Sequence, residues 1–193
     1  MKVMHEQQSY TSYPIAELIR NRRTVRSFRS DPVSHELLME LLDIANWAPN
    51  HGSREPWRYI LYRGASRTAF AEAVLGAMSA EEKDKYAEQR LNDYGRIPLH
   101  LIVVMKEDPR QKQWDEDYGA VCCWIQNFQL AAWERGIGVV WKTNSGFCIS
   151  ATRRRCRSLE PGRPPHCGST YANSRLIPFQ RHDGANGILL PIR

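Results

Sequence analysis

Two long stretches of the chain place apolar residues every three or four positions, the spacing of a helix that buries one face. The first begins after Ser34, whose hydroxyl suits a helix N-cap, and runs through Trp47 to a stop at Pro49. The second runs from about Asp117 to Arg135 and ends before Gly136. Its apolar residues lie on more than one side: Tyr118, Val121, Cys122, Cys123, Trp124, Ile125, Phe128, Ala131, Ala132 and Trp133. We therefore predict two core helices, of which the second is buried on several sides.

Shorter patterns around these two helices predict the remaining elements. Proline in a first turn and apolar stripes indicate helices, whereas runs of aromatic and β-branched residues indicate strands. Helices are predicted over 14–22, 65–77 and 80–94, strands over 57–62, 98–105 and 138–143, and an extended segment over 22–28. Beyond Asn144 neither pattern continues, and we expect that segment to be irregular.

The composition is that of one globular domain: 193 residues, of which 42% are hydrophobic and 25% charged. The longest apolar stretch, 97–105, is far shorter than a membrane-spanning helix, so we predict no membrane span. The residues after Lys2 are polar and lack the apolar core of a signal peptide. They predict a cytoplasmic protein with reduced cysteines.

The net charge of +6 is concentrated at one end of the chain. Residues 1–144 contain 19 basic and 19 acidic residues, whereas residues 145–193 contain eight arginines, no lysine and two acidic residues. The same last stretch holds five of the eleven prolines and three of the five cysteines. We therefore divide the chain into an electrically balanced domain, 1–144, and an Arg-, Pro- and Cys-rich tail, 145–193.

Three arginines close together, Arg22, Arg23 and Arg26, flank Thr24 and form the first candidate site. Guanidinium groups bind phosphate through paired hydrogen bonds, and a hydroxyl adds another. Basic residues at the end of a helix also interact favourably with the helix dipole without binding a ligand. Composition alone leaves both roles open.

A second candidate site follows the first core helix. His51 lies in a polar turn and could act as a general acid or contact a ligand, although a turn histidine more often bonds only to the backbone. Trp47, Trp57 and Trp141 could stack on a planar ring, or simply pack at the edge of a core. The sequence contains no zinc-site spacing, nucleophile elbow, P-loop or dinucleotide-binding glycine motif.

Taken in order, these segments resemble the FMN-dependent nitroreductase family. The resemblance rests on RRTVRSF (22–28), a capped helix ending in WAPNH (47–51), EPWRYILY (55–62), the buried central helix and GIGVVWKT (136–143). It covers about residues 15–144. It implies an α+β fold with a mainly antiparallel central sheet surrounded by helices, assembled as an intertwined homodimer with two FMN sites at the interface. The second apolar face of the central helix agrees with a homodimer, because a partner subunit would have to cover that face.

The resemblance also implies which residues hold the phosphate end of FMN. Arg22, Arg23 and Thr24 match positions that hold the phosphate and ribityl chain. Arg26 matches a basic position near the N1/O2 edge of the flavin, where a cation stabilises the reduced ring.

Two further segments match positions around the flavin ring. Trp47, Asn50 and His51 match a segment that reaches the flavin of the other subunit. The end of the last predicted strand matches a strand end that borders the flavin ring near N5. Its residues in this chain are Val140, Trp141, Lys142 and Thr143. The implied activity is ping-pong transfer of electrons from NADH or NADPH, through FMN, to a small acceptor such as a nitroaromatic or quinone.

The tail departs from the family pattern, which would continue after WKTN with an apolar helix, a turn and an apolar strand. We expect none of these in 145–193 and infer that the region is translated in a shifted reading frame. Its arginines could instead bind nucleic acid or another anionic surface, in a flavin-poor or inactive family member, although a solvated tail is the simpler expectation. The expected partners are thus a second subunit and a small-molecule acceptor, and neither a membrane nor nucleic acid.

Sequencing of the coding DNA around codons 144–150 tests the reading-frame hypothesis. We expect one of the two alternative frames to encode an apolar helix followed by an apolar strand. A coding sequence in which neither frame does so would contradict the hypothesis.

Overall fold

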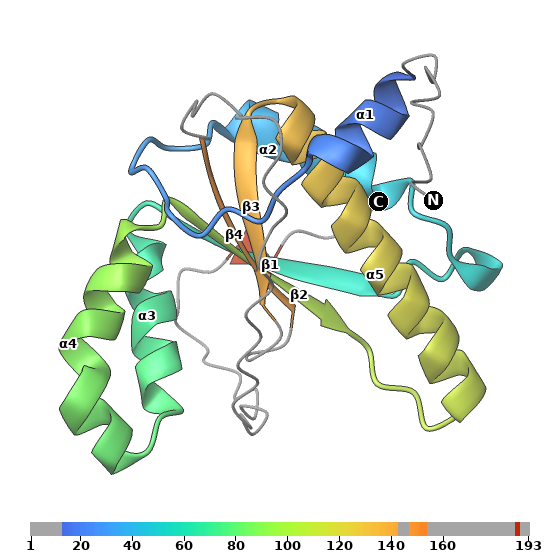
Figure 1. Cartoon of the computed structure of the whole chain (residues 1–193). Helices are drawn as coiled ribbons and strands as arrows, with labels where there is room; N and C mark the ends of the chain where they lie inside the picture. The colour runs from blue at the N-terminus through green and yellow to red at the C-terminus, as the bar shows by residue number, and fades with distance from the viewer. Residues whose placement is uncertain (1–12, 143–146, 154–187, 190–193) are drawn as a thin grey trace, which may run out of the picture.

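The protein has an α+β fold in which one antiparallel sheet lies between two layers of helices (Figure 1). The structure, a computed structural model, describes residues 13–142, 147–153 and 188–189, and the side chains of 13–142. The helices are α1 (Pro14–Asn21), α2 (His35–Asn46), the 3₁₀ helix η1 (His51–Ser53), α3 (Ser66–Gly76), α4 (Ala80–Arg96) and α5 (Gln111–Glu134). The strands are β1 (Trp57–Arg63), β2 (Leu99–Met105), β3 (Ile137–Lys142), β4 (Phe147–Arg153) and β5 (Ile188–Leu189).

The sheet has the strand order β3-β4-β2-β1-β5, and all neighbouring strands are antiparallel. Strand β4 corrects the expectation of irregular structure beyond Asn144, because it pairs with β2 on one side and β3 on the other. Hydrogen bonds to both neighbours stabilise a strand whose local sequence gives little signal. The rest of the tail, apart from β5, lies outside the described residues.

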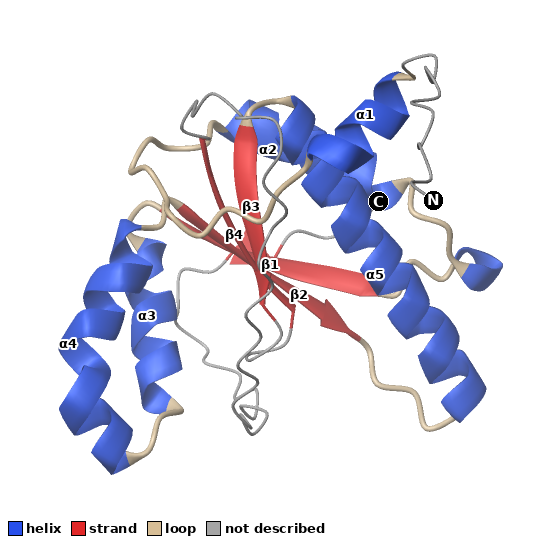
Figure 2. Cartoon of the chain, viewed as in Figure 1, coloured by secondary structure: helices blue, strands red, loops and turns tan. Residues whose placement is uncertain are grey.

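The larger core lies between one face of the sheet and helices α2 and α5 (Figure 2). Alternate residues of β1 and β2 enter it, with Tyr59 paired to Val103 in the ladder. The Tyr59 ring also stacks on that of Trp124, with centroids 5.7 Å apart. The N-cap predicted for α2 is confirmed, because the Ser34 hydroxyl accepts a hydrogen bond from the amide of Leu37 at 3.3 Å.

Helix α5 is buried on several sides, as predicted, although it begins six residues before the predicted start at Asp117. The sequence signal missed this beginning because residues 111–116 are mostly polar and present no apolar stripe. The buried residues are Asp117, Ala120, Val121, Trp124, Ile125, Phe128, Gln129, Ala131, Ala132 and Trp133. Cys123 and Tyr118, which were counted among the apolar groups, are exposed.

Asn46, the last residue of α2, joins three elements of this core. Its Oδ1 accepts hydrogen bonds from the indole Nε1 of Trp57, at 3.1 Å, and from that of Trp124, at 2.9 Å. Both tryptophans are fully buried, so no water can replace this acceptor. A single amide oxygen therefore fixes the end of α2 against β1 and α5.

Helices α3 and α4 cover the opposite face of the sheet around a smaller apolar cluster. His100 of β2 is fully buried there; its ring lies 4.2 Å from that of Phe70, and its Nε2 donates to the carbonyl oxygen of Tyr94 at 2.9 Å. Burial lowers the pKa of His100 to about 4, because the imidazolium ion would lose its hydration. The histidine therefore serves as a neutral link between β2 and the end of α4.

Replacing Asn46 by Ala removes the acceptor of two buried indole N–H groups. We expect the free energy of unfolding to fall by about 2 to 5 kcal/mol, since each unsatisfied buried donor costs about 1–3 kcal/mol. Urea denaturation followed by fluorescence measures the change. Asp43→Ala, on an exposed position of the same helix, is the control and should change it by no more than about 0.5 kcal/mol. Equal effects of the two substitutions would contradict the role assigned to Asn46.

His100 makes stability depend on pH in a defined direction. Its pKa of about 4 lies below the ordinary value of 6.5, so between these values the unfolded chain binds the proton more readily. The free energy of unfolding should therefore fall as the pH drops from 6.5 to 4, by at most about 3 kcal/mol from this group. His100→Gln keeps a donor for Tyr94 and does not titrate, so its urea midpoint should lose less over this range than that of the wild type. An equal fall of the urea midpoint in the wild type and in His100→Gln would refute this prediction.

Candidate functional site

The segment that carries the three predicted arginines runs beside β3. Thr24 forms a parallel bridge with Val139, and the amide of Val25 donates to the carbonyl oxygen of Val139 at 3.0 Å. This pairing covers the outer edge of β3 and brings the arginine segment next to the strand end formed by Val140, Trp141 and Lys142. Two of the predicted site segments, more than a hundred residues apart in sequence, thus lie side by side.

Gly138 makes this close approach possible. A Cβ atom added at Gly138 would lie 2.6 Å from Cγ2 of Val25, and it would also be too close to Cβ of Val25. No larger residue fits unless the segment moves away from the strand. The second glycine of GIGVV is therefore explained by packing against the arginine segment.

The cationic side chains of this segment divide into two kinds. Arg23 turns back and donates from Nη1 to the carbonyl oxygens of Arg20 and Arg22, which satisfies acceptors at the end of α1. Arg22 is half-buried and Arg26 exposed. Within 13–142, the region with described side chains, neither guanidinium group makes a hydrogen bond or ion pair. Arg23 therefore takes the helix-end role that the composition left open. Phosphate binding by Arg22 and Arg26 stays a prediction.

The end of β3 presents side chains of different burial. Val140 is buried, Trp141 is half-buried against the larger core, and Lys142 is exposed. The Nζ of Lys142 lies 5.7 Å from the centre of the Tyr94 ring, a cation–π contact that joins β3 to α4. Thr143, the last predicted site residue, lies outside the described residues.

The second predicted segment, after α2, combines exposed side chains with a tightly bonded turn. The side chain of Trp47 is 84% exposed and that of His51 is exposed as well. Asn50 uses both ends of its amide within the turn: Nδ2 donates to the carbonyl of Ala48 at 3.3 Å, and Oδ1 accepts from the amide of Glu55 at 2.9 Å. Asn50 thus shapes the turn, while Trp47 and His51 remain accessible. A hollow of about 190 Å³ lies beside His51, lined by Arg110, Lys112, Gln113 and Glu116.

A single chain does not bring the two predicted segments together. Figure 1 shows η1, which contains His51, on the far side of α5 from the loop that follows α1. The assignment of Trp47, Asn50 and His51 to the site of another subunit is compatible with this separation and stays a prediction.

An ion pair that the sequence analysis missed anchors the turn to α5. Arg54 donates from Nε to Oδ1 of Asp117 at 3.2 Å and from Nη2 to Oδ2 at 2.9 Å, in the paired geometry typical of arginine with carboxylate. Only 4% of the Asp117 side chain is exposed. Hydrogen bonding to the Asp117 carboxylate raises the pKa of Arg54, so the guanidinium stays charged. The two residues are 63 positions apart, and no local pattern reveals such a pair.

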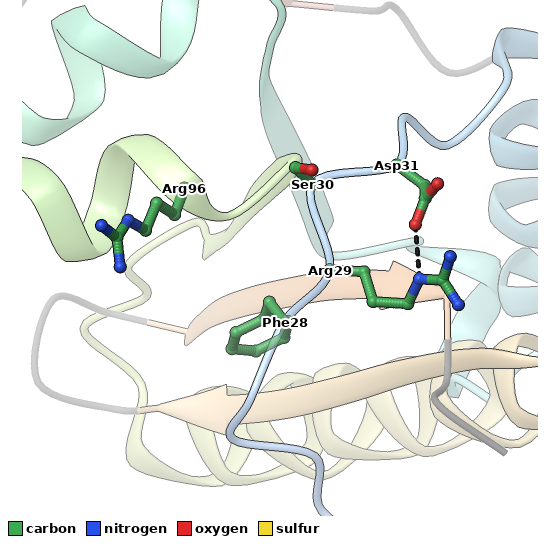
Figure 3. A pocket seen from close by; sticks show the side chains of 5 residues that line it. All are labelled: Phe28, Arg29, Ser30, Asp31 and Arg96. Atoms are coloured by element: carbon green, nitrogen blue, oxygen red, sulfur yellow. Dashed lines mark hydrogen bonds and ion pairs between the residues drawn. The ribbon is translucent and has the colours of Figure 1, made fainter.

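An open cavity of about 660 Å³ lies where the arginine segment continues toward α2, and the sequence analysis did not anticipate it. Phe28, Arg29, Ser30 and Asp31 line it together with Arg96 from the end of α4 (Figure 3). Arg29 forms an ion pair with Asp31 at 2.5 Å, and Arg96 extends away from that pair. The lining therefore offers an aromatic ring and a net positive charge.

Comparison with known proteins assigns the chain to a family. The sequence model described as the Nitroreductase family matches residues 19–158, and the chain belongs to this family. The match contains every predicted site residue and continues past residue 144, through β4. Among curated relatives, the putative NAD(P)H nitroreductase YfhC of Bacillus subtilis is 38% identical over 133 residues, which is 67% of this chain and 69% of the relative.

Solved structures agree on the fold. A nitroreductase-like family protein from Bacillus cereus superposes with a TM-score of 0.72 at 38% identity, over 83% of this chain and 95% of that one. A nitroreductase from Bacteroides fragilis, solved with bound FMN, superposes with a TM-score of 0.62 at 20% identity, over 84% of this chain and all of that one. The expected nitroreductase-like fold is thereby confirmed. None of the described helices has the length and apolar character to cross a membrane.

Proposed function

We propose that this protein is an FMN-dependent oxidoreductase that takes electrons from NADH or NADPH and passes them to a small acceptor, such as a nitroaromatic or quinone. The observation that carries the proposal is the pairing of Thr24 and Val25 with Val139. It holds the segment that carries Arg22 and Arg26 beside β3, in a chain of the Nitroreductase family. We further propose that the protein works in the cytoplasm, where the sequence analysis expects it.

The residues present suit FMN. Arg22 and Arg26 supply cations with no recorded partner among the described side chains, and Thr24, which is exposed, adds a hydroxyl. Such groups bind a phosphate monoester through charge-assisted hydrogen bonds. Gly138 leaves no side chain between this segment and the strand, so the phosphate-binding groups and the strand end remain at a fixed spacing.

Each part of the proposed site has a separate task. Arg22 and Thr24 hold the phosphate and ribityl chain, and Arg26 places a positive charge near the ring edge, where negative charge accumulates on reduction. The exposed end of β3, with Lys142, borders the ring. When bound, FMN supplies the hydride-accepting and electron-donating chemistry, and the protein supplies placement and electrostatics.

We propose that the active form is a homodimer. Several large apolar side chains are uncovered in one chain: Ile15 is 71% exposed, Ile19 53% and Trp47 84%. Helix α1 buries none of its residues, although one of its sides is apolar. A partner subunit would cover these groups, and the same contact would carry Trp47 and His51 to the partner's flavin.

The alternative, an inactive protein whose basic tail binds nucleic acid, concerns residues that lie mostly outside the described ranges. The described core, in contrast, has the arginine segment beside β3, and it also contains the turn of His51. Residues 13–142 therefore favour the flavin enzyme.

The visible spectrum of the purified protein tests the proposed function directly. We expect a yellow protein with about one FMN per chain, whose absorption bleaches when NADH or NADPH is added without oxygen. In the double variant Arg22→Gln/Arg26→Gln the FMN dissociation constant should rise by about a hundred-fold, since each charge-assisted hydrogen bond contributes about 1.5–3 kcal/mol.

Arg90→Gln, an exposed position on α4, is the matched control and should leave the FMN affinity within two-fold. A colourless protein that takes up no added FMN would overturn the proposal. Equal loss of affinity in the control would show that surface charge in general, and not this segment, holds the cofactor.

A further inference from the structure

The turn between α2 and β1 is held in an unfavourable backbone conformation. Gly52, Ser53 and Glu55 have φ values of 61°, 52° and 42°, all in the left-handed region. Only glycine adopts this region without steric cost, so Ser53 and Glu55 keep it only where other groups hold them. No residue from His51 to Arg54 is buried, and the apolar core therefore does not supply the holding force.

Two sets of polar contacts supply that force. On one side the Oδ1 of Asn50 accepts from the amide of Glu55, which closes the turn within itself. On the other side the guanidinium of Arg54, between the two strained residues, is bound by both carboxylate oxygens of Asp117. The first contact shapes the turn, and the second fixes its position and orientation on α5.

From this we propose that Asp117 is a positioning residue: through Arg54 it sets the strained turn so that His51 is presented to the flavin of the partner subunit. The part of this proposal that concerns the flavin rests on the proposed function. The placement of His51 by Asp117 does not, because it concerns contacts within one chain.

Asp117 is suited to this role because it is itself immobile. Its carboxylate is almost completely buried in a helix that is packed on several sides, and Oδ1 also accepts from Nε2 of Gln113 at 3.1 Å. Gln113 in turn lines the hollow beside His51, so the network reaches the surface on which His51 lies. A fork of two hydrogen bonds restricts the orientation of Arg54, which a single bond would not do.

A second carboxylate near Arg54 does not duplicate this function. Asp108 lies 3.5 Å from Nη2 of Arg54, at the limit of a hydrogen bond, whereas it binds Arg110 at 2.8 and 2.9 Å. Arg110 lowers the pKa of Asp108, which keeps that carboxylate ionised and engaged with Arg110. Asp117 is therefore the principal partner of Arg54.

Two measurements on the full-length protein test the proposal. The first follows the ring signal of His51 by NMR without added flavin, assigned by its loss in His51→Gln. Asp117→Asn should shift or broaden this signal, because the fork to Arg54 loses one charged acceptor. The second is titration with FMN, in which Asp117→Asn should raise the dissociation constant about ten-fold or more, as expected when a contacting group is misplaced.

Glu40→Gln is the matched control. It removes the ion pair between Glu40 of α2 and Arg135, the residue that follows α5, and it does not touch the turn. Both the His51 signal and the FMN affinity should stay as in the wild type. Arg54→Lys keeps the charge but loses the fork, and it should change both readouts in the same direction as Asp117→Asn but less. If Asp117→Asn does not fold, the His51 signal and the FMN affinity of Arg54→Lys test the proposal in its place.

The outcomes separate this inference from the proposed function. A His51 signal that shifts in Asp117→Asn and not in Glu40→Gln, together with weaker FMN binding, supports both. A wild type that binds no FMN refutes the proposed function, while the NMR comparison still decides whether Asp117 places His51. An unchanged His51 signal and unchanged FMN affinity in a folded, less stable Asp117→Asn variant would overturn the inference, since the pair would then only stabilise the fold.

Discussion

The side-chain oxygen of Asn46 is the contact on which the arrangement of this protein most depends. Two large indole rings fill the centre of the core, and each brings an N–H group to a place that water does not reach. Because one amide oxygen accepts from both, the end of α2 has a fixed position relative to β1 and α5. The chain emerges from that point into the turn of His51. The placement of a surface turn is therefore determined by a polar requirement inside the core.

Away from the core, polar contacts fix the positions of the surface segments. The arginine segment is held by backbone pairing with β3, and the turn of His51 by the Arg54–Asp117 pair. In both places the residues that hold the chain differ from the exposed residues that we propose as ligand contacts. Arg23 caps α1 while Arg22 and Arg26 remain accessible, and Asn50 closes the turn while His51 points outward. This separation gives a rigid support for groups that remain accessible at the surface.

The sequence was sufficient for most of the helices and for the strands of the central ladder, because periodic apolar residues mark both. It failed where stability comes from distant partners. The first turns of α5 are polar, and β4 is recognisable only through its two neighbours in the sheet. An ordered set of motifs predicts the candidate site residues, yet the fork between Arg54 and Asp117 joins positions that no local spacing connects. The need for glycine at 138 likewise depends on Val25, a residue far away in the chain.

The contact between Val25 and Gly138 also bears on how such a protein can evolve. The valine side chain and the strand glycine fit each other closely, so a larger residue at position 138 requires a change at position 25. Arg26, the residue after that valine, is exposed and carries no comparable packing constraint. Charge at this edge can thus be added, removed or exchanged by single mutations without repacking the interior. One scaffold can in this way change the charge that it presents at this edge while its architecture stays the same.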